Sequence, residues 1–194
     1  MNIGIFGGAF NPVHNGHLAL AKHYKDSLSL DRLIYIPTAN PPHKPSGNLI
    51  DGEHRINMLK LCVGDDEVCD IEFRHDGKSY TYLTLQELRR AYPNDKLYLI
   101  IGADQFFYFE NWYKYEEILS LATVVTAARE GNQYSQMLEF KAQHPSLKDV
   151  VVSEFEVIDV SSSQIRNAVS QGEDISQYVP KRVEEYIKEH RLYV

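Results

Sequence analysis

Two histidines follow a glycine pair near the start of the chain, within Gly7-Gly8-Ala9-Phe10-Asn11-Pro12-Val13-His14-Asn15-Gly16-His17. The i, i+3 spacing of His14 and His17 puts both imidazoles on one face where a helix begins. Glycines let the backbone approach a ligand, and a helix N-terminus attracts anions to which imidazole N–H groups can also donate. The segment therefore predicts a phosphate site, although a turn with two exposed histidines is the simpler explanation of a bare pair.

A second candidate phosphate site lies near the other end of the chain, in Ser161-Ser162-Ser163-Gln164-Ile165-Arg166. Serine hydroxyls at a helix start can cap the helix or bind phosphate. Arg166 adds a planar, permanently charged fork that suits phosphate oxygens. Taken alone, this segment fits helix capping beside a solvated arginine equally well.

Three further positions could contact a ligand. Lys44, on the loop Pro41-Pro42-His43-Lys44-Pro45, can bring a point charge to a polyphosphate, or it can be a solvated loop lysine. Trp112 is the only tryptophan, and its ring can stack on a flat ligand or simply belong to the core. Asp104 can accept hydrogen bonds from ribose hydroxyls, cap the next helix, or do both.

Apolar periodicity predicts alternating strands and helices. Strands are expected at 3–6, 32–37, 69–73, 96–101, 123–128, 150–155 and 157–160, and helices at 18–28, 54–63, 81–92, 115–121, 163–171 and 180–190. The least periodic stretch, 131–148, is expected to be a surface excursion. Such alternation implies a mostly parallel α/β sheet flanked by helices on both faces. Because ligands bind beyond the carboxyl ends of such strands, segments 7–17, 41–44, 102–104 and 161–166 should converge on one cleft.

The composition is that of a globular α/β enzyme, and we expect residues 1–194 to form a single domain. Hydrophobic residues make up 43% and charged residues 24% of the 194 residues. Cys62 and Cys69 have neither disulfide-framework nor metal-ligand spacing, so we expect no protein metal site. The net charge of -7 argues against broad contact with nucleic acid or membranes. Without a visible leader or a long apolar run, we expect a cytoplasmic protein, and a homo-oligomer remains compatible with the sequence.

Taken whole, the first segment resembles the HxGH signature of the nucleotidylyltransferase superfamily, and Val160-Ser161-Ser162-Ser163-Gln164-Ile165-Arg166 resembles its ISSTxIR motif. Between them, the chain is similar over its full length to the bacterial nicotinate mononucleotide adenylyltransferase family. The supporting strings are Pro41-Pro42-His43-Lys44, His54-Arg55, Ser79-Tyr80-Thr81, Ile101-Gly102-Ala103-Asp104, Trp112-Tyr113 and Leu192-Tyr193.

The resemblance implies a Rossmann-like fold with ATP and nicotinate mononucleotide as substrates. It implies catalytic roles for His14, His17, Lys44 and Arg166. The implied ATP-binding residues are Gly7, Gly8, Phe10, His14, His17, Lys44, Gly102, Asp104, Ser161, Ser162, Ser163 and Arg166. The implied nicotinate mononucleotide-binding residues are Gly8, Ala9, Thr81, Asp104, Trp112 and Tyr113, with Trp112 on the pyridine ring and Thr81 on the carboxylate.

The chain departs from the family pattern at three places. Asn11 and Leu83 stand where the family more often has Asp, and Arg129-Glu130-Gly131 replaces a commoner Arg-Pro-Gly. None of these changes removes a phosphate-binding side chain.

The resemblance further implies direct, in-line attack of the acceptor phosphate on the α-phosphorus of ATP, without a covalent enzyme intermediate. Mg²⁺ would be bound mainly through the ATP phosphates, so no carboxylate cage is needed. The alternatives are a related adenylyltransferase that uses nicotinamide mononucleotide or pantetheine phosphate, and a noncatalytic nucleotide sensor. An RNA-binding module is disfavoured because no interleaved basic and aromatic platform is visible.

Overall fold

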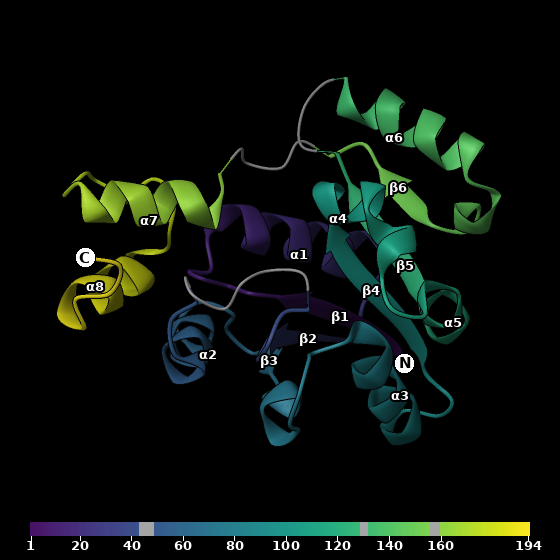
Figure 1. The fold of residues 1–194 in the computed structure, drawn as a ribbon, viewed down its shortest axis with the longest axis horizontal. Helices are drawn as coiled ribbons and strands as arrows, with labels where there is room; N and C mark the ends of the chain where they lie inside the picture. Colours follow the sequence, from purple (N-terminus) through teal and green to yellow (C-terminus); the bar gives the residue numbers. More distant parts are fainter. Residues whose placement is uncertain (43–48, 129–131, 156–159) are drawn as a thin grey trace.

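The computed structural model describes residues 1–42, 49–128, 132–155 and 160–194. Six parallel strands form one sheet in the order β3-β2-β1-β4-β5-β6, which confirms the expected architecture (Figure 1). The strands are β1 (Asn2–Gly8), β2 (Arg32–Pro37), β3 (Glu67–Val68), β4 (Lys96–Gly102), β5 (Thr123–Ala127) and β6 (Val151–Ser153). Strand order reverses between β1 and β4, and such a switch point opens a crevice beyond the strand ends.

Helices cover both faces of the sheet. One core cluster contains residues of α1 (Asn15–Ser27), α2 (Gly52–Lys60), α7 (Ser162–Ser170) and α8 (Lys181–Glu189). The other contains residues of α3 (Thr81–Ala91), α4 (Ala103–Phe107), α5 (Tyr115–Leu121) and α6 (Gln133–Gln143). Consecutive residues of β2 alternate between the two clusters, with Leu33 and Tyr35 in the first and Ile34 and Ile36 in the second. This period of two is why a buried parallel strand reads as a continuous apolar run.

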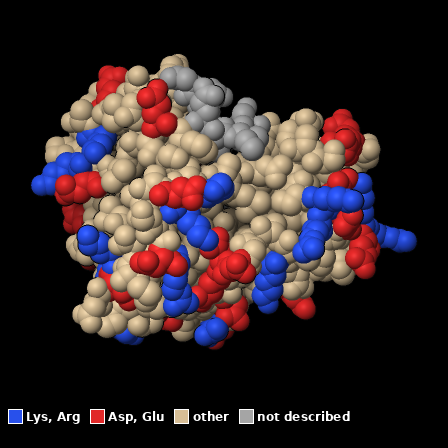
Figure 2. Space-filling model, turned by 180° about the vertical axis from the view of Figure 1, so that it is seen from behind, with Lys and Arg blue, Asp and Glu red and all other residues tan. Residues whose placement is uncertain are grey.

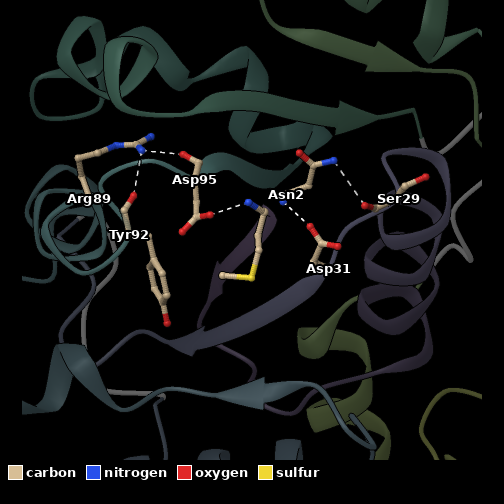
Figure 3. A network of polar contacts seen from close by, with 7 residues as sticks. Asn2, Ser29, Asp31, Arg89, Tyr92 and Asp95 are labelled. Carbon is tan, nitrogen blue, oxygen red and sulfur yellow. Dashed lines mark hydrogen bonds and ion pairs between the residues drawn. The ribbon is translucent and has the colours of Figure 1, made fainter.

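Polar contacts hold the sheet at its amino-terminal end, away from the glycine loop (Figure 3). The Asn2 backbone N–H donates to Asp31 Oδ2 at 2.7 Å. Arg89 Nη1 donates to the carbonyls of Tyr92 at 3.2 Å and Asp95 at 2.7 Å, in the turn that leads from α3 into β4. These contacts fix the starts of β1 and β4, whose carboxyl ends carry the candidate site.

The expected strand at 69–73 is wrong. The strand is β3, which precedes it, and residues Ile71–Arg74 form the 3-10 helix η2. The alternation of apolar residues was misleading because Phe73 is 38% exposed, whereas Glu72 turns inward and accepts a hydrogen bond from the Ala39 N–H. The strand expected at 157–160 can be checked only at Val160, because residues 157–159 lie outside the described residues. Val160 is not in a strand.

The surface excursion expected at 131–148 is also wrong. Residues 133–143 form α6, and the 3-10 helix η4 (Pro145–Leu147) follows. Met137 and Leu147 are fully buried. The helical signal was the spacing of Tyr134, Met137 and Phe140, which all belong to or pack against the second core cluster. At the C-terminus, α8 starts at Lys181, so Pro180 is the N-cap rather than the first helical residue.

The buried position of Met137 gives a direct test of this correction. Met137→Ala should lower the free energy of unfolding by about 2–5 kcal/mol, because it leaves a cavity under α6. Leu138, the next residue, is 42% exposed, so Leu138→Ala should change it by less than about 0.5 kcal/mol. Urea unfolding of both variants measures the difference, and equal effects would show that α6 does not present Met137 to the core.

The surface carries mixed charge. On the face shown in Figure 2, basic and acidic side chains are interspersed. Elsewhere in the described structure, ion pairs such as Lys22 with Asp26 and Lys188 with Glu184 join neighbouring turns of a helix. An anionic ligand must therefore be held by local geometry rather than by a broad basic field on this face. Among the described residues, no helix has the length and apolar character needed to span a bilayer.

Candidate active site

A cavity of about 640 Å³ lies at the carboxyl ends of β1 and β4, at the switch point of the sheet. All the predicted site residues except Lys44 line it: Gly7, Gly8, Ala9, Phe10, His14, His17, Thr81, Gly102, Asp104, Trp112, Tyr113, Ser161, Ser162, Ser163 and Arg166. Lys44 lies outside the described residues, although Pro41 and Pro42 before residues 43–48 and Leu49 after them also line the cavity. Segments far apart in the sequence thus meet in one place.

The histidine pair forms the N-terminus of α1. His14 is the N-cap, and its Nδ1 accepts from the His17 N–H at 3.3 Å. In return, His17 Nδ1 accepts from the His14 N–H at 3.3 Å, so the two imidazoles complete a reciprocal capping box. The rings stack with centroids 3.6 Å apart. Because each Nδ1 is an acceptor, the neutral ring carries its proton on Nε2 and can donate from there.

Phe10 supports this pair from the core side. Its side chain is 1% exposed, and its ring meets the His17 ring edge-on at 5.1 Å and the Phe6 ring at 5.4 Å. At the end of β1, a Cβ on Gly7 would meet nothing within 4 Å, so the backbone there opens onto the cavity. The bulk of Phe10 therefore fixes the imidazole, while the glycine leaves room for a ligand.

The N-terminus of α7 forms the second polar corner. Ser161 is the N-cap, and its hydroxyl accepts from the Gln164 N–H at 3.2 Å while Gln164 Oε1 accepts from the Ser161 N–H at 2.7 Å. The capping explanation of Ser161 therefore holds. Two helix N-termini, those of α1 and α7, face the same cavity, and both favour an anion.

Two hydrogen bonds join these corners directly. Arg166 Nη1 donates to the Asn11 carbonyl at 2.8 Å, and Ser162 Oγ donates to the Pro12 carbonyl at 2.9 Å. Arg166 Nη2 also donates to Ser163 Oγ at 3.1 Å. A guanidinium has five N–H groups, so Arg166 keeps donors for a ligand while it holds the loop.

The opposite wall of the cavity comes from elements on the other face of the sheet. Thr81 is the first residue of α3, where backbone N–H groups have no partner inside the helix. The Trp112 ring packs against Phe109 with centroids 5.2 Å apart, and its Nε1 is buried without a partner among the described residues. Tyr113 packs on Tyr80 at 4.7 Å. This wall combines N–H donors with flat aromatic surfaces.

Two charged residues that line or support the cavity were not predicted as site residues. Arg55 is 1% exposed, although the string His54-Arg55 contributed to the family resemblance. Glu72 lines the cavity, and burial raises the pKa of its carboxyl group. For Arg55, the only signal in the sequence was a charged residue inside an apolar helical pattern. Glu72 gave no signal, because it lies in the segment that was expected to be a strand.

The departures from the family pattern have distinct surroundings. Asn11 Oδ1 accepts from the Tyr193 hydroxyl at 3.0 Å and the Ile50 N–H at 3.4 Å, so it ties the chain end to the histidine loop. Burial raises the pKa of Tyr193, which keeps its hydroxyl a donor. Leu83 is 46% exposed on α3. Residues 129–131 lie outside the described residues.

The donor set of the cavity suits oxygen anions. In the described ranges, no three His, Cys, Asp or Glu side chains gather where they could hold a metal ion. Imidazole, hydroxyl, backbone N–H and guanidinium groups instead converge near the two helix N-termini. This arrangement can bind a polyphosphate, with a flat ring against the aromatic wall.

Comparison with known proteins agrees with this geometry. A family model described as cytidylyltransferase-like matches residues 5–168. A curated relative from Citrifermentans bemidjiense, named "probable nicotinate-nucleotide adenylyltransferase", is 38% identical over 100% of this chain and 99% of its own. A relative of the same name from Clostridium tetani is 37% identical over 97% of each chain.

A solved structure shows the same fold. The Plasmodium falciparum nicotinic acid mononucleotide adenylyltransferase, complexed with NaAD, superposes with a TM-score of 0.78 at 20% identity, over 99% of this chain and 97% of its own. The N-termini of α1 and α7, which carry the two sequence motifs, meet in one cavity of this fold. The curated relatives align with 97% or more of this chain. The chain therefore belongs to the cytidylyltransferase-like family and, within it, to the nicotinate-nucleotide adenylyltransferases.

Proposed function

We propose that the chain transfers the adenylyl group of ATP to nicotinate mononucleotide, giving nicotinate adenine dinucleotide and pyrophosphate. The observation that carries this proposal is the convergence of the N-termini of α1 and α7, with His14, His17 and Arg166, on one cavity. Membership of the family supports the choice of reaction.

The reaction is a direct displacement. A 5′-phosphate oxygen of the acceptor bonds to the α-phosphorus of ATP, and the bond from that phosphorus to the bridging oxygen breaks, so pyrophosphate leaves with the electron pair. The attacking oxygen is anionic near neutral pH, and a general base therefore contributes little. Catalysis rests on alignment and on donors aimed at the charge that builds on the transferred and leaving groups.

Each polar corner has a role in this displacement. His14 and His17 donate from Nε2 to oxygens of the reacting phosphates. Arg166, together with Ser162, Ser163 and the first N–H groups of α7, holds the β and γ phosphates. Lys44 joins them from its loop, and Gly102 with Asp104 takes the ribose hydroxyls.

Mg²⁺ fits this site as a partner of the substrate. The N–H, O–H and guanidinium groups bind oxygen anions and do not ligate a cation, so the ion would be held by ATP phosphates and water. When bound there, it neutralises charge on the polyphosphate.

Selectivity for the acid acceptor comes from the aromatic wall. The nicotinate ring stacks on Trp112, and its carboxylate meets the Thr81 hydroxyl and the N–H groups at the start of α3. A carboxylate matches these donors, whereas a carboxamide places an NH₂ donor against them.

Pyrophosphate release in the presence of ATP and Mg²⁺ tests the proposal. We expect the highest kcat/KM with nicotinate mononucleotide, and lower values with nicotinamide mononucleotide and pantetheine phosphate. A preference for either of the other acceptors would overturn the substrate assignment. ATP binding without pyrophosphate release from any acceptor would instead indicate a nucleotide sensor.

A further inference from the structure

One peptide group just beyond β2 has a charged side chain at each end. Its carbonyl, that of Thr38, accepts from Arg55 Nη1 at 2.7 Å. Its N–H, that of Ala39, donates to Glu72 Oε2 at 3.3 Å. A peptide dipole is negative at oxygen and positive at the N–H, so both charges interact favourably with it. The orientation of this peptide is therefore held from two sides.

Arg55 connects the peptide to the loop before the histidine pair, where the resemblance places Gly8 and Phe10 at ATP and Gly8 and Ala9 at the acceptor. The same Nη1 donates to the Ala9 carbonyl at 2.9 Å, and Nε donates to the Ile50 carbonyl at 3.1 Å. Ala9 follows the glycine pair of β1 and lines the cavity, as does Thr38. Burial lowers the pKa of the guanidinium, so the charge is kept at a cost in desolvation.

Glu72 connects the peptide to the acceptor side. Its Oε1 accepts from Thr84 Oγ1 at 2.9 Å, and Thr84 lies on α3 one turn after Thr81. Burial raises the pKa of Glu72, while hydrogen bonds from Ser79, Thr84 and the Ala39 N–H lower it. The carboxylate thus holds the first turn of α3 against the end of β2.

We propose that Arg55 and Glu72 are a pair of positioning residues that set the two halves of the active site through the shared Thr38–Ala39 peptide. Arg55 sets the backbone between Gly8 and Phe10, which leads into the histidine pair proposed to bind the ATP phosphates, and Glu72 sets the N-terminus of α3 that receives the acceptor. Neither residue contacts the reacting atoms. The inference rests on the proposed function, because it divides the site into ATP and acceptor halves.

The test compares Arg55→Lys and Glu72→Gln with wild type, using pyrophosphate release for KM and kcat and calorimetry for ATP binding. Lysine keeps the charge, but its three donors share one nitrogen and cannot reproduce the separate Nε and Nη1 positions of Arg55. ATP affinity and kcat should therefore each fall ~10-fold or more. Glutamine keeps the shape but replaces one acceptor oxygen with a donor. Its KM for nicotinate mononucleotide should rise ~10-fold while ATP affinity stays within about 2-fold.

Two controls keep the outcome decisive. Arg74→Lys makes the same substitution at an arginine that is 64% exposed and paired with Asp70, and it should leave all constants unchanged. Thr84→Val removes the hydroxyl that donates to Glu72 Oε1 and leaves both charged residues in place. It should therefore raise the KM for the acceptor even if Arg55→Lys or Glu72→Gln fails to fold. In the Arg55→Lys/Glu72→Gln double variant, the loss of kcat/KM should be smaller than the product of the two single-variant losses, because both side chains act on one peptide.

The inference is overturned if the variants lower thermal stability but leave KM, kcat and ATP affinity unchanged, or if both shift the ATP and acceptor constants equally. An unchanged KM for the acceptor in Thr84→Val would overturn the positioning role proposed for Glu72. Failure of the proposed function looks different: wild type would then release no pyrophosphate with nicotinate mononucleotide, while calorimetry would still report whether Arg55→Lys weakens ATP binding.

Discussion

Replacing His17 with alanine is expected to lower the rate of adenylyl transfer about 100-fold or more, because it removes one preorganised donor from the charge that develops on the phosphates. ATP should still bind, since Arg166 and the α7 N-terminus remain. The loss should therefore appear mainly in kcat. Steady-state pyrophosphate release, with the folded fraction checked by thermal unfolding, measures it.

The capping role of His17 has to be separated from its proposed role in catalysis. His17→Gln restores an N3 side chain that can accept the N-cap N–H, which is the arrangement that Gln164 has in α7. This variant should fold like wild type and still turn over slowly. His75→Ala, at a histidine outside the cavity, should be fully active. Near-normal turnover by folded His17→Ala and His17→Gln would exclude the proposed role.

Arg166→Lys is expected to lower kcat/KM for ATP about 10-fold or more, because one ammonium nitrogen cannot replace the two terminal nitrogens that reach Asn11 and Ser163 and also present a planar fork to phosphate. In the proposed mechanism, Arg166 binds phosphates that are already charged in the bound substrate, so KM for ATP should rise more than kcat falls. The contrast with His17 separates holding the polyphosphate from stabilising the transition state.

The matched control is Arg182→Lys, because Arg182 is exposed on α8. It should leave both constants unchanged. If Arg166→Lys binds ATP as tightly as wild type does in calorimetry, Arg166 only anchors the Asn11 loop and does not hold phosphate.

Local patterns in the sequence were sufficient for five of the six strands and for the convergence of four segments on one cleft, whereas several of the individual lining residues followed only from the family resemblance. Strand 32–37 and the helix at 81–92 followed from apolar periodicity and agree with β2 and α3 to within one residue. The His14–His17 spacing also reflects local physics, because an N-cap and an N3 residue always come together at a helix start. A search for capping boxes that admitted histidine as acceptor would have found it.

Contacts between residues far apart in the sequence could not be predicted from local patterns. Arg55 and Glu72 hold the Thr38–Ala39 peptide across 17 and 33 positions of sequence, and no local period reports such a contact. Residues 69–73 were misassigned because five alternating residues cannot distinguish a strand from a 3-10 helix when the polar side chain faces inward. Helix α6 was missed because Leu138, an exposed apolar residue, interrupts the helical spacing of Tyr134, Met137 and Phe140.

A crystal structure with the non-hydrolysable analogue α,β-methylene-ATP would show whether the N-termini of α1 and α7 bind one triphosphate between them. We predict phosphate oxygens within hydrogen-bonding distance of the His14 and His17 Nε2 atoms on one side and of Arg166 with the first N–H groups of α7 on the other. A triphosphate bound away from either helix N-terminus would contradict this prediction.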